Sequence, residues 1–286
     1  MAVKFFGQYL VEKSVISRET LLKSIALQET VNKTIGDIAI EMGMMSQSDV
    51  EQVNMAQRNE DLRFADLAVK MGLLTEDALQ QALTKQSESH IHIGKAIIMV
   101  GGVDANLVSG FLEEFEEEQS QYATDRVVLP PGLKLQALYE MMADLSYKML
   151  TRVARLKFRP VPCEIVSQIK EADVVAAMDI TGDTRCRYII SVSEDVQAQI
   201  AKAILAQEKV SQESKEVLDD TVMEFVNVIC GNIAAKSAQL GIALDIMPPE
   251  LLDSKGGINV PEEFIALDFP ICLTNGKASF TIIIYP

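Results

Sequence analysis

One polar helix face in the sequence carries residue types that suit a hydrolytic site. Within residues 214–240, Asp220, Glu224 and Asn227 are spaced i, i+4 and i+7, and Pro249 follows further on. At about 3.6 residues per turn, the three side chains project from one face of a helix. A carboxylate one turn from an amide can bind a cation while the amide orients a water, which suits a hydrolysis that depends on positioning. A Glu-x-x-Asn pair alone is also common on solvated helix faces, so the full four-residue pattern is what favours a site.

The segments around this face predict an α/β domain. Apolar residues at helical spacing predict a first helix over 133–156, and two short β-branched runs predict a hairpin over 174–181 and 186–192. Ser193, followed by two acidic residues, predicts the N-cap of a helix that ends near Gln207. The long helix over 214–240 follows. An Asn-Gly turn then separates the last two predicted strands, 263–273 and 277–285.

The motif and its surroundings, EVLDDTVMEFVNVICGNIAAKSAQLG, resemble the CheC/CheX/FliY family of chemotaxis phosphatases, and CheX in particular. The resemblance covers about residues 133–286. It implies an enzyme that hydrolyses the aspartyl phosphate of a CheY-like response regulator, in chemotaxis or related two-component signalling. It further implies that Asn227 orients the attacking water and that Glu224 anchors the regulator through its active-site lysine. The residues that support the motif are Asp220, Gly231 and Pro249.

The resemblance also bears on the number of sites, the cofactors and the partners. CheC-type members repeat the site on the first helix, but Glu140 is followed at that spacing by Ala143, so we expect one site. No cofactor or metal is expected in this protein, and Mg²⁺ is expected on the phosphorylated regulator. CheX relatives form dimers, which leaves a homodimer open. The alternative function is a non-catalytic scaffold that binds a response regulator.

The N-terminal half contains an internal repeat with a period of 29 residues. The repeated positions are Gly7, Gly36, Ala65 and Gly94, then Ser14, Gly43, Gly72 and Gly101, then Leu21, Val50, Leu79 and Val108, then Gln28, Gln57 and Gln86 with Phe115 in the fourth unit. Each unit predicts a short helix, a turn, a polar cap and a second helix. The predicted caps are Ser17, Ser46, Thr75 and Asp104. Four stacked units would share a core that no single unit could form.

These repeats resemble the N-terminal domains of type II secretion and pilus ATPases, including the MshE-type module that binds cyclic di-GMP. The module's Arg position is occupied by Phe5, Thr34, Arg63 and His92. Only one unit keeps the guanidinium that would bind guanine or phosphate, and that unit has Ala65 instead of glycine. We therefore favour a docking array for a protein partner over a cyclic di-GMP site.

Composition is consistent with two domains in one chain of 286 residues, of which 48% are hydrophobic. The predicted fold class is an all-α repeat domain over 1–124, a linker over 125–132 and an α/β (α+β) domain over 133–286. The net charge of -15 argues against a nucleic-acid partner. No apolar run approaches the ~20 residues of a membrane span. The cysteines are Cys163, Cys186, Cys230 and Cys272, and because they lack C-x-x-C spacing we expect packed thiols in a cytoplasmic protein.

Overall fold

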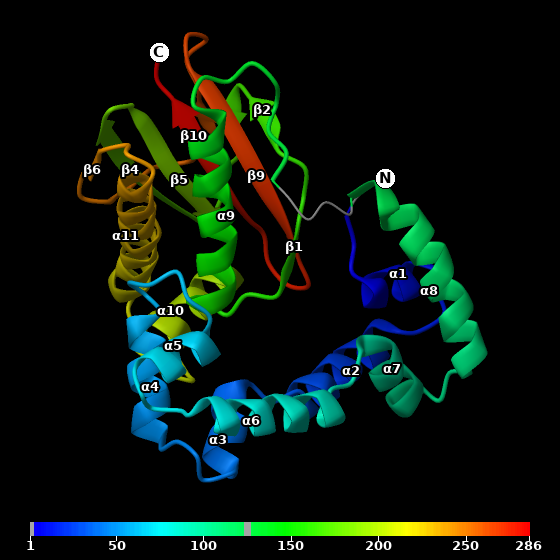
Figure 1. The fold of residues 1–286 in the computed structure, drawn as a ribbon. Coiled ribbons are helices and arrows are strands. Elements are labelled where there is room, and N and C mark those ends of the chain that lie inside the picture. Colours follow the sequence, from blue (N-terminus) through cyan, green and yellow to red (C-terminus); the bar gives the residue numbers. More distant parts are fainter. Residues whose placement is uncertain (1–2, 123–126) are drawn as a thin grey trace. The chain divides into compact units, whose positions relative to one another are not determined.

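The computed structural model describes residues 3–122 and 127–286. The chain divides into two compact units, Met1–Gln57 with Leu62–Ala123 and Arg58–Asp61 with Thr124–Pro286. The first unit is helical and the second is α/β, which confirms the predicted fold class (Figure 1). Residues 125 and 126 of the predicted linker, and the end of the predicted repeat domain at residues 123 and 124, lie outside the described residues.

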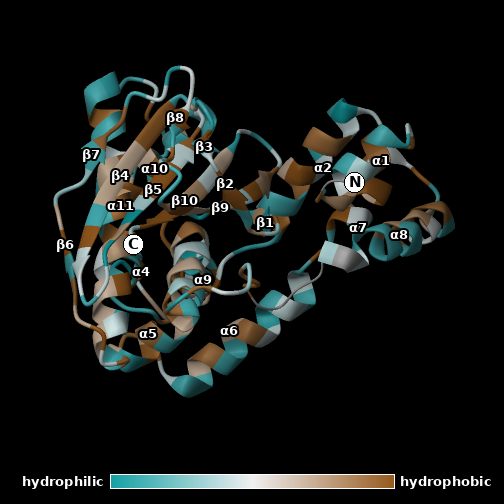
Figure 2. Cartoon of the chain, turned by 90° about the horizontal axis from the view of Figure 1, so that it is seen from above, coloured by the Kyte–Doolittle hydropathy of each residue, from teal (hydrophilic) through white to brown (hydrophobic). Residues whose placement is uncertain are grey.

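The helical unit consists of four helix pairs, one in each repeat. Repeat one contains α1 Phe6–Glu12 and α2 Arg18–Val31, and repeat two contains α3 Ile35–Glu41 and α4 Gln47–Ala56. Repeat three contains α5 Phe64–Lys70 and α6 Glu76–Ser89, and repeat four contains α7 Ile93–Gly101 and α8 Ala105–Gln119. The four predicted caps are confirmed, since each accepts a hydrogen bond from a backbone N–H in the first turn of the second helix. Figure 2 shows hydrophilic and hydrophobic residues alternating along α6, as expected for a helix with one buried face.

The turns inside the repeats need a backbone with positive φ. Ser14, Gly43 and Gly72 adopt it, with φ of 59°, 67° and 70°. In the fourth repeat α7 continues through Gly101, and the positive φ of 60° falls on Gly102. The prediction of Gly101 as the fourth turn residue is therefore wrong by one position, because the helix in that repeat is longer.

The first glycine of a repeat permits close packing of the two helices. A Cβ at Gly7 would lie 2.3 Å from Cδ1 of Leu21, and a Cβ at Gly36 would lie 3.1 Å from Cγ1 of Val50. Leu21 and Val50 are the residues 14 positions further along their repeats. The glycine and the later apolar residue therefore recur together because one makes room for the other.

The sequence predicted one core shared by all four repeats, but the repeats form two separate cores. Repeats one and four bury one cluster: Phe6, Tyr9, Leu10, Ile16, Leu21, Ile97, Val108 and Phe115. Repeats two and three bury another: Ala39, Met45, Val50, Val53, Leu67, Ala68 and Leu74. The predicted stack of successive repeats is corrected to a pairing of one with four and of two with three.

The repeated glutamine explains how each pair is held. Each one donates from Nε2 to the backbone oxygen of the residue two positions before the first helix of the partner repeat: Gln28 to Ile91 at 3.1 Å, Gln57 to Leu62 at 3.0 Å and Gln86 to Lys33 at 3.0 Å. The fourth repeat has Phe115 at this position, and Gln119 accepts instead from the N–H of Lys4 at 3.1 Å. In each pair of repeats, each repeat therefore makes such a hydrogen bond to the other.

Replacing Gln57 with methionine is expected to lower the free energy of unfolding of the helical unit by about 1–3 kcal/mol, because the carbonyl of half-buried Leu62 loses the donor that buried Gln57 supplies. Urea unfolding followed by helix circular dichroism measures the change. Gln81 on α6 is exposed, so Gln81→Met is the matched control and should stay within about 0.5 kcal/mol of wild type. Equal stability of the two variants would show that the glutamine contact contributes nothing.

The α/β unit is built on an antiparallel sheet. Its strand order is β1-β9-β10-β5-β4-β6, with β2 paired to β9 and β7 paired to β4, and a second sheet pairs β3 with β8. The strands are β1 Phe158–Pro160, β2 Glu164–Val166, β3 Gln168–Ile169, β4 Val174–Gly182, β5 Cys186–Val192, β6 Leu244–Ile246, β7 Glu250–Leu251, β8 Ile258–Asn259, β9 Ile265–Leu273 and β10 Ala278–Ile284. The two predicted hairpins are β4–β5 and β9–β10. The six short strands were not predicted.

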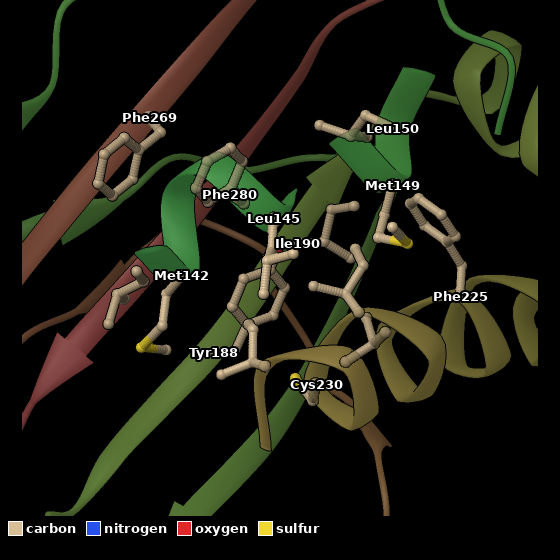
Figure 3. Close-up of a cluster of buried hydrophobic side chains, with 14 of the residues drawn as sticks. Met142, Leu145, Met149, Leu150, Tyr188, Ile190, Phe225, Cys230, Phe269 and Phe280 are labelled. Carbon is tan, nitrogen blue, oxygen red and sulfur yellow. The ribbon is translucent and has the colours of Figure 1, made fainter. Parts of the chain in front are cut away.

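Three helices complete this unit: α9 Gln136–Arg152, α10 Glu194–Leu205 and α11 Lys215–Gln239. Side chains from α9 and α11 meet those of β5, β9 and β10 in one core (Figure 3). Its largest fully buried members include Tyr139, Tyr188, Phe225, Phe269 and Phe280. The first helix starts later than the predicted residue 133 because Leu135 has a positive φ of 56°, and it ends at Arg152, before the positive φ of 55° at Arg155, instead of at residue 156.

The predicted role of Ser193 is only half right. Ser193 is the N-cap residue of α10, but its side chain makes no capping hydrogen bond. Its Oγ instead accepts from the N–H of Lys277 at 2.9 Å, while Asp173 accepts from the N–H of Glu194 at 3.0 Å. The serine therefore joins the start of α10 to the β9–β10 turn.

Among the described residues, no helix is long and apolar enough to cross a bilayer.

Candidate functional site

Helix α11 has a clear start and one continuous buried face. Ser214 accepts from the N–H of Val217 at 3.3 Å and so caps the first turn. The buried face consists of Thr221, Val222, Phe225, Val226, Val228, Ile229, Cys230, Asn232, Ile233 and Ser237. Because this face packs against the sheet and α9, the opposite face is left to solvent with a fixed orientation.

Glu224 and Asn227 lie side by side on that exposed face. Nδ2 of Asn227 is 3.5 Å from Oε2 of Glu224, a long contact that leaves both side chains largely available. Within residues 3–122 and 127–286, no Lys or Arg side chain pairs with Glu224, and no donor reaches the amide oxygen of Asn227. The pair therefore offers one carboxylate and one amide oxygen to a molecule outside the chain.

The other predicted site residues lie in two places. Asp220 is exposed one turn before Glu224 and Gly231 is half-buried one turn after Asn227, so both belong to the same face of α11. Pro249 is half-buried between β6 and β7. Its segment is joined to β4 on both sides. The N–H of Met247 donates to the backbone oxygen of Asp179 at 2.9 Å, and β7 pairs with Ala176 and Ala177.

Two positioning contacts were not predicted from the sequence. Gln197 of α10 is buried and donates from Nε2 to Oδ1 of Asp219 at 2.7 Å, which ties α10 to α11 one residue before Asp220. Asn232 is 8% exposed and donates to the carbonyl of Val228 at 2.8 Å. Asp219 and Asp220 cannot be told apart from sequence alone, since either could face α10 until the orientation of the helix is known.

The first helix of the unit carries no second copy of the pair. On α9, Glu140 is half-buried and accepts from Nε2 of Gln136 at 2.7 Å. Ala143, at the position of the amide, is fully buried. A polar amide placed at residue 143 would face the core instead of solvent.

The four cysteines are free thiols. Burial raises the pKa of Cys186 to about 12 and raises the pKa of Cys230 well above its usual range. A thiol with such a pKa stays protonated near neutral pH and is a poor nucleophile. Within the described parts of the chain, no three His, Cys, Asp or Glu side chains cluster as metal ligands would, and His90 and His92 are exposed with their ring centroids 5.1 Å apart.

Comparison with known proteins gives a family match for part of the chain. Residues 174–272, which contain the whole of β4 to β8 and most of β9 as well as α10 and α11, match the family model of the chemotaxis phosphatase CheX. No curated protein matches the chain.

Three solved structures resemble the chain over about half its length. A chemotaxis protein CheX from Desulfovibrio desulfuricans is 18% identical, with 52% of this chain and 99% of that chain covered and a TM-score of 0.45. CheX from Vibrio vulnificus is 23% identical, with 51% and 97% covered and a TM-score of 0.44. A CheX–CheY–BeF3–Mg complex from Borrelia burgdorferi is 20% identical, with 51% and 96% covered and a TM-score of 0.39. The part of this chain that matches the family model of the chemotaxis phosphatase CheX is therefore residues 174–272 of the α/β unit.

Proposed function

We propose that this protein hydrolyses the aspartyl phosphate of a CheY-like response regulator, using Glu224 and Asn227. The family match supports a phosphatase role. The observation that carries the assignment of residues is the exposure of both side chains, next to each other on α11, with no internal partner of opposite charge among the described residues. A pair held in that way is available to a protein substrate.

The reaction transfers a phosphoryl group from the regulator's aspartate to water. The P–O bond to the aspartyl oxygen breaks, a P–O bond to the water oxygen forms, and carboxylate and inorganic phosphate are the products. The carbonyl oxygen of Asn227 accepts a hydrogen bond from the water and so fixes its direction of attack. Charge on the phosphoryl group is balanced by Mg²⁺ that the regulator itself carries, so this chain supplies positioning and no metal.

Glu224 supplies the anchor. Its carboxylate forms an ion pair with a lysine at the regulator's active site, and its contact with Nδ2 orients the amide of Asn227. Asp220, one turn earlier, adds a second negative charge to the same face. The helical repeats act as a docking module that brings the phosphatase to a protein partner.

Glu224→Gln is expected to raise the KM for phosphorylated regulator by about 10-fold with a smaller change in kcat, because a charge-assisted hydrogen bond of about 1.5 kcal/mol is lost on binding. The KM of wild type should rise with salt, and that of the variant should rise less. Steady-state phosphate release at two ionic strengths measures both effects. Glu216→Gln, at an exposed position two turns earlier, is the control and should behave as wild type. A variant with unchanged KM and an unchanged salt dependence would remove Glu224 from the interface.

The direct test is the decay of phosphorylated response regulators with and without the whole chain. Acceleration of at least one regulator's decay, with release of inorganic phosphate, supports the proposal. No acceleration across the full set of regulators, together with measurable binding of one of them, would overturn it in favour of a regulator-binding scaffold.

A further inference from the structure

Gly231 occupies a place on α11 where nothing inside the described structure calls for a glycine. It lies in the interior of a 25-residue helix, one turn after Asn227. Apart from its chain neighbours and the nearby backbone of α11 itself, a Cβ built at this position meets no atom within 4 Å. A helix-interior glycine lowers the folding equilibrium constant about fivefold relative to alanine, because it adds freedom to the unfolded chain. Alanine would therefore fit this helix and favour its folding.

The other glycines show how unusual this is. All fifteen lie within residues the structure describes, and most have either a positive φ or a neighbouring atom close to the missing Cβ. Only Gly110 and Gly231 have neither. Gly110 is in α8 of the helical unit, whereas Gly231 follows the Glu224–Asn227 pair along the exposed face of α11.

The direction of a side chain at residue 231 matters for that pair. In an α-helix the Cα–Cβ bond tilts toward the N-terminus, so a side chain covers the turn that precedes its own Cα. A methyl group at residue 231 would therefore stand over the turn that carries Asn227. Any molecule that brings a reacting group to the amide of Asn227 has to approach through this space.

We propose that Gly231 is a contact residue for the response regulator. The backbone of the regulator packs directly on the turn of α11 beside Asn227, where Gly231 has no side chain. This inference rests on the proposed phosphatase function and adds the residue that sets how closely the regulator can approach. The interface requires that residue 231 has no side chain, so the loss of affinity for the regulator caused by a replacement grows with the size of the new side chain.

The test measures phosphate release from phosphorylated regulator and melting temperature for Gly231→Ala, Gly231→Leu and the matched control Gly110→Ala in the full chain. Both alanine variants should melt about 2–4 °C higher than wild type. Gly231→Ala should raise the KM roughly 5- to 150-fold, since an extra methyl in a packed contact is strongly unfavourable. Gly231→Leu should raise it further, and Gly110→Ala should leave it unchanged.

A double variant, Gly231→Ala with Ala235→Gly, separates close approach from helix flexibility, because it returns a glycine to the same face one turn later. Close approach predicts that the KM stays high, and recovery of the wild-type KM would overturn the proposal. Wild-type kinetics for Gly231→Ala would also overturn it. Failure of wild type itself to dephosphorylate any regulator would instead overturn the proposed function.

Discussion

Replacing Asn227 with alanine is expected to reduce the acceleration of regulator dephosphorylation by about 100- to 1,000-fold, the usual loss when one positioned hydrogen-bonding group is removed from a transition state. The physical reason is that the variant keeps its carboxylate anchor but no longer fixes the direction of the water. The fold should be untouched, because Asn227 is exposed and the one side-chain hydrogen bond that it makes to a described residue, Glu224, is long. Alanine also has the higher helix propensity, so the melting temperature should stay equal or rise slightly.

The readout is kcat for phosphate release at saturating regulator, with binding of a beryllofluoride-activated regulator measured in parallel. Binding should change less than threefold while kcat falls. Gln239→Ala removes another exposed amide from α11, three turns further along, and should change neither quantity. If Asn227→Ala kept wild-type kcat, the water-orienting role would belong to another group, and the assignment of this residue would be wrong.

The parts of the fold that could be predicted from sequence are those whose signals are local. The start of α11 at Ser214, the four repeat caps and the β4–β5 hairpin each depend on a few consecutive residues, and all agree with the structure. The strands that were missed contain two or three residues, too short for alternation of polar and apolar residues to show. Four of them, β1, β2, β6 and β7, pair with the edges of β9 and β4, whereas β3 and β8 pair with each other, and both pairings are properties of the finished fold.

The pairing of the repeats could not be predicted for a different reason. All four repeats present the same apolar pattern, so the sequence alone allows any repeat to pack on any other. The deciding contacts join residues distant in the chain, such as Gln28 with Ile91 and Lys4 with Gln119. The fourth repeat also moves its glutamine by one helical turn, from position 115 to 119, which removes it from the repeat pattern.

The exposed pair was predictable as a helix face, but its rigidity was not. Residues 224 and 227 face solvent while residues 225 and 226 between them are fully buried, so the site depends on how tightly two intervening side chains pack. The contact of Gln197 with Asp219 then fixes α11 against α10. These contacts involve α10, β5 and α9, and nothing near the motif in the sequence identifies them.

Replacing Phe225 with alanine is expected to lower the free energy of unfolding of the α/β unit by about 3–5 kcal/mol, the usual range for a fully buried phenylalanine that leaves a cavity. Phe225 is 0% exposed and lies in the core with Tyr188 and Met149 (Figure 3). For a unit of this size the loss corresponds to a fall of about 6–20 °C in melting temperature. Calorimetry of the full chain and urea unfolding measure it.

Met223→Ala is the matched control, because Met223 is only partly buried at the edge of the same core and the alanine favours the helix. Its change should stay below about 1.5 kcal/mol. Phe225→Ala should also lose phosphatase activity at temperatures where it is still folded, since a cavity under the helix loosens the positions on either side of residue 225. Full activity in a folded but strongly destabilised variant would show that the pair tolerates movement of α11 and that its positions are set mainly by the bound regulator.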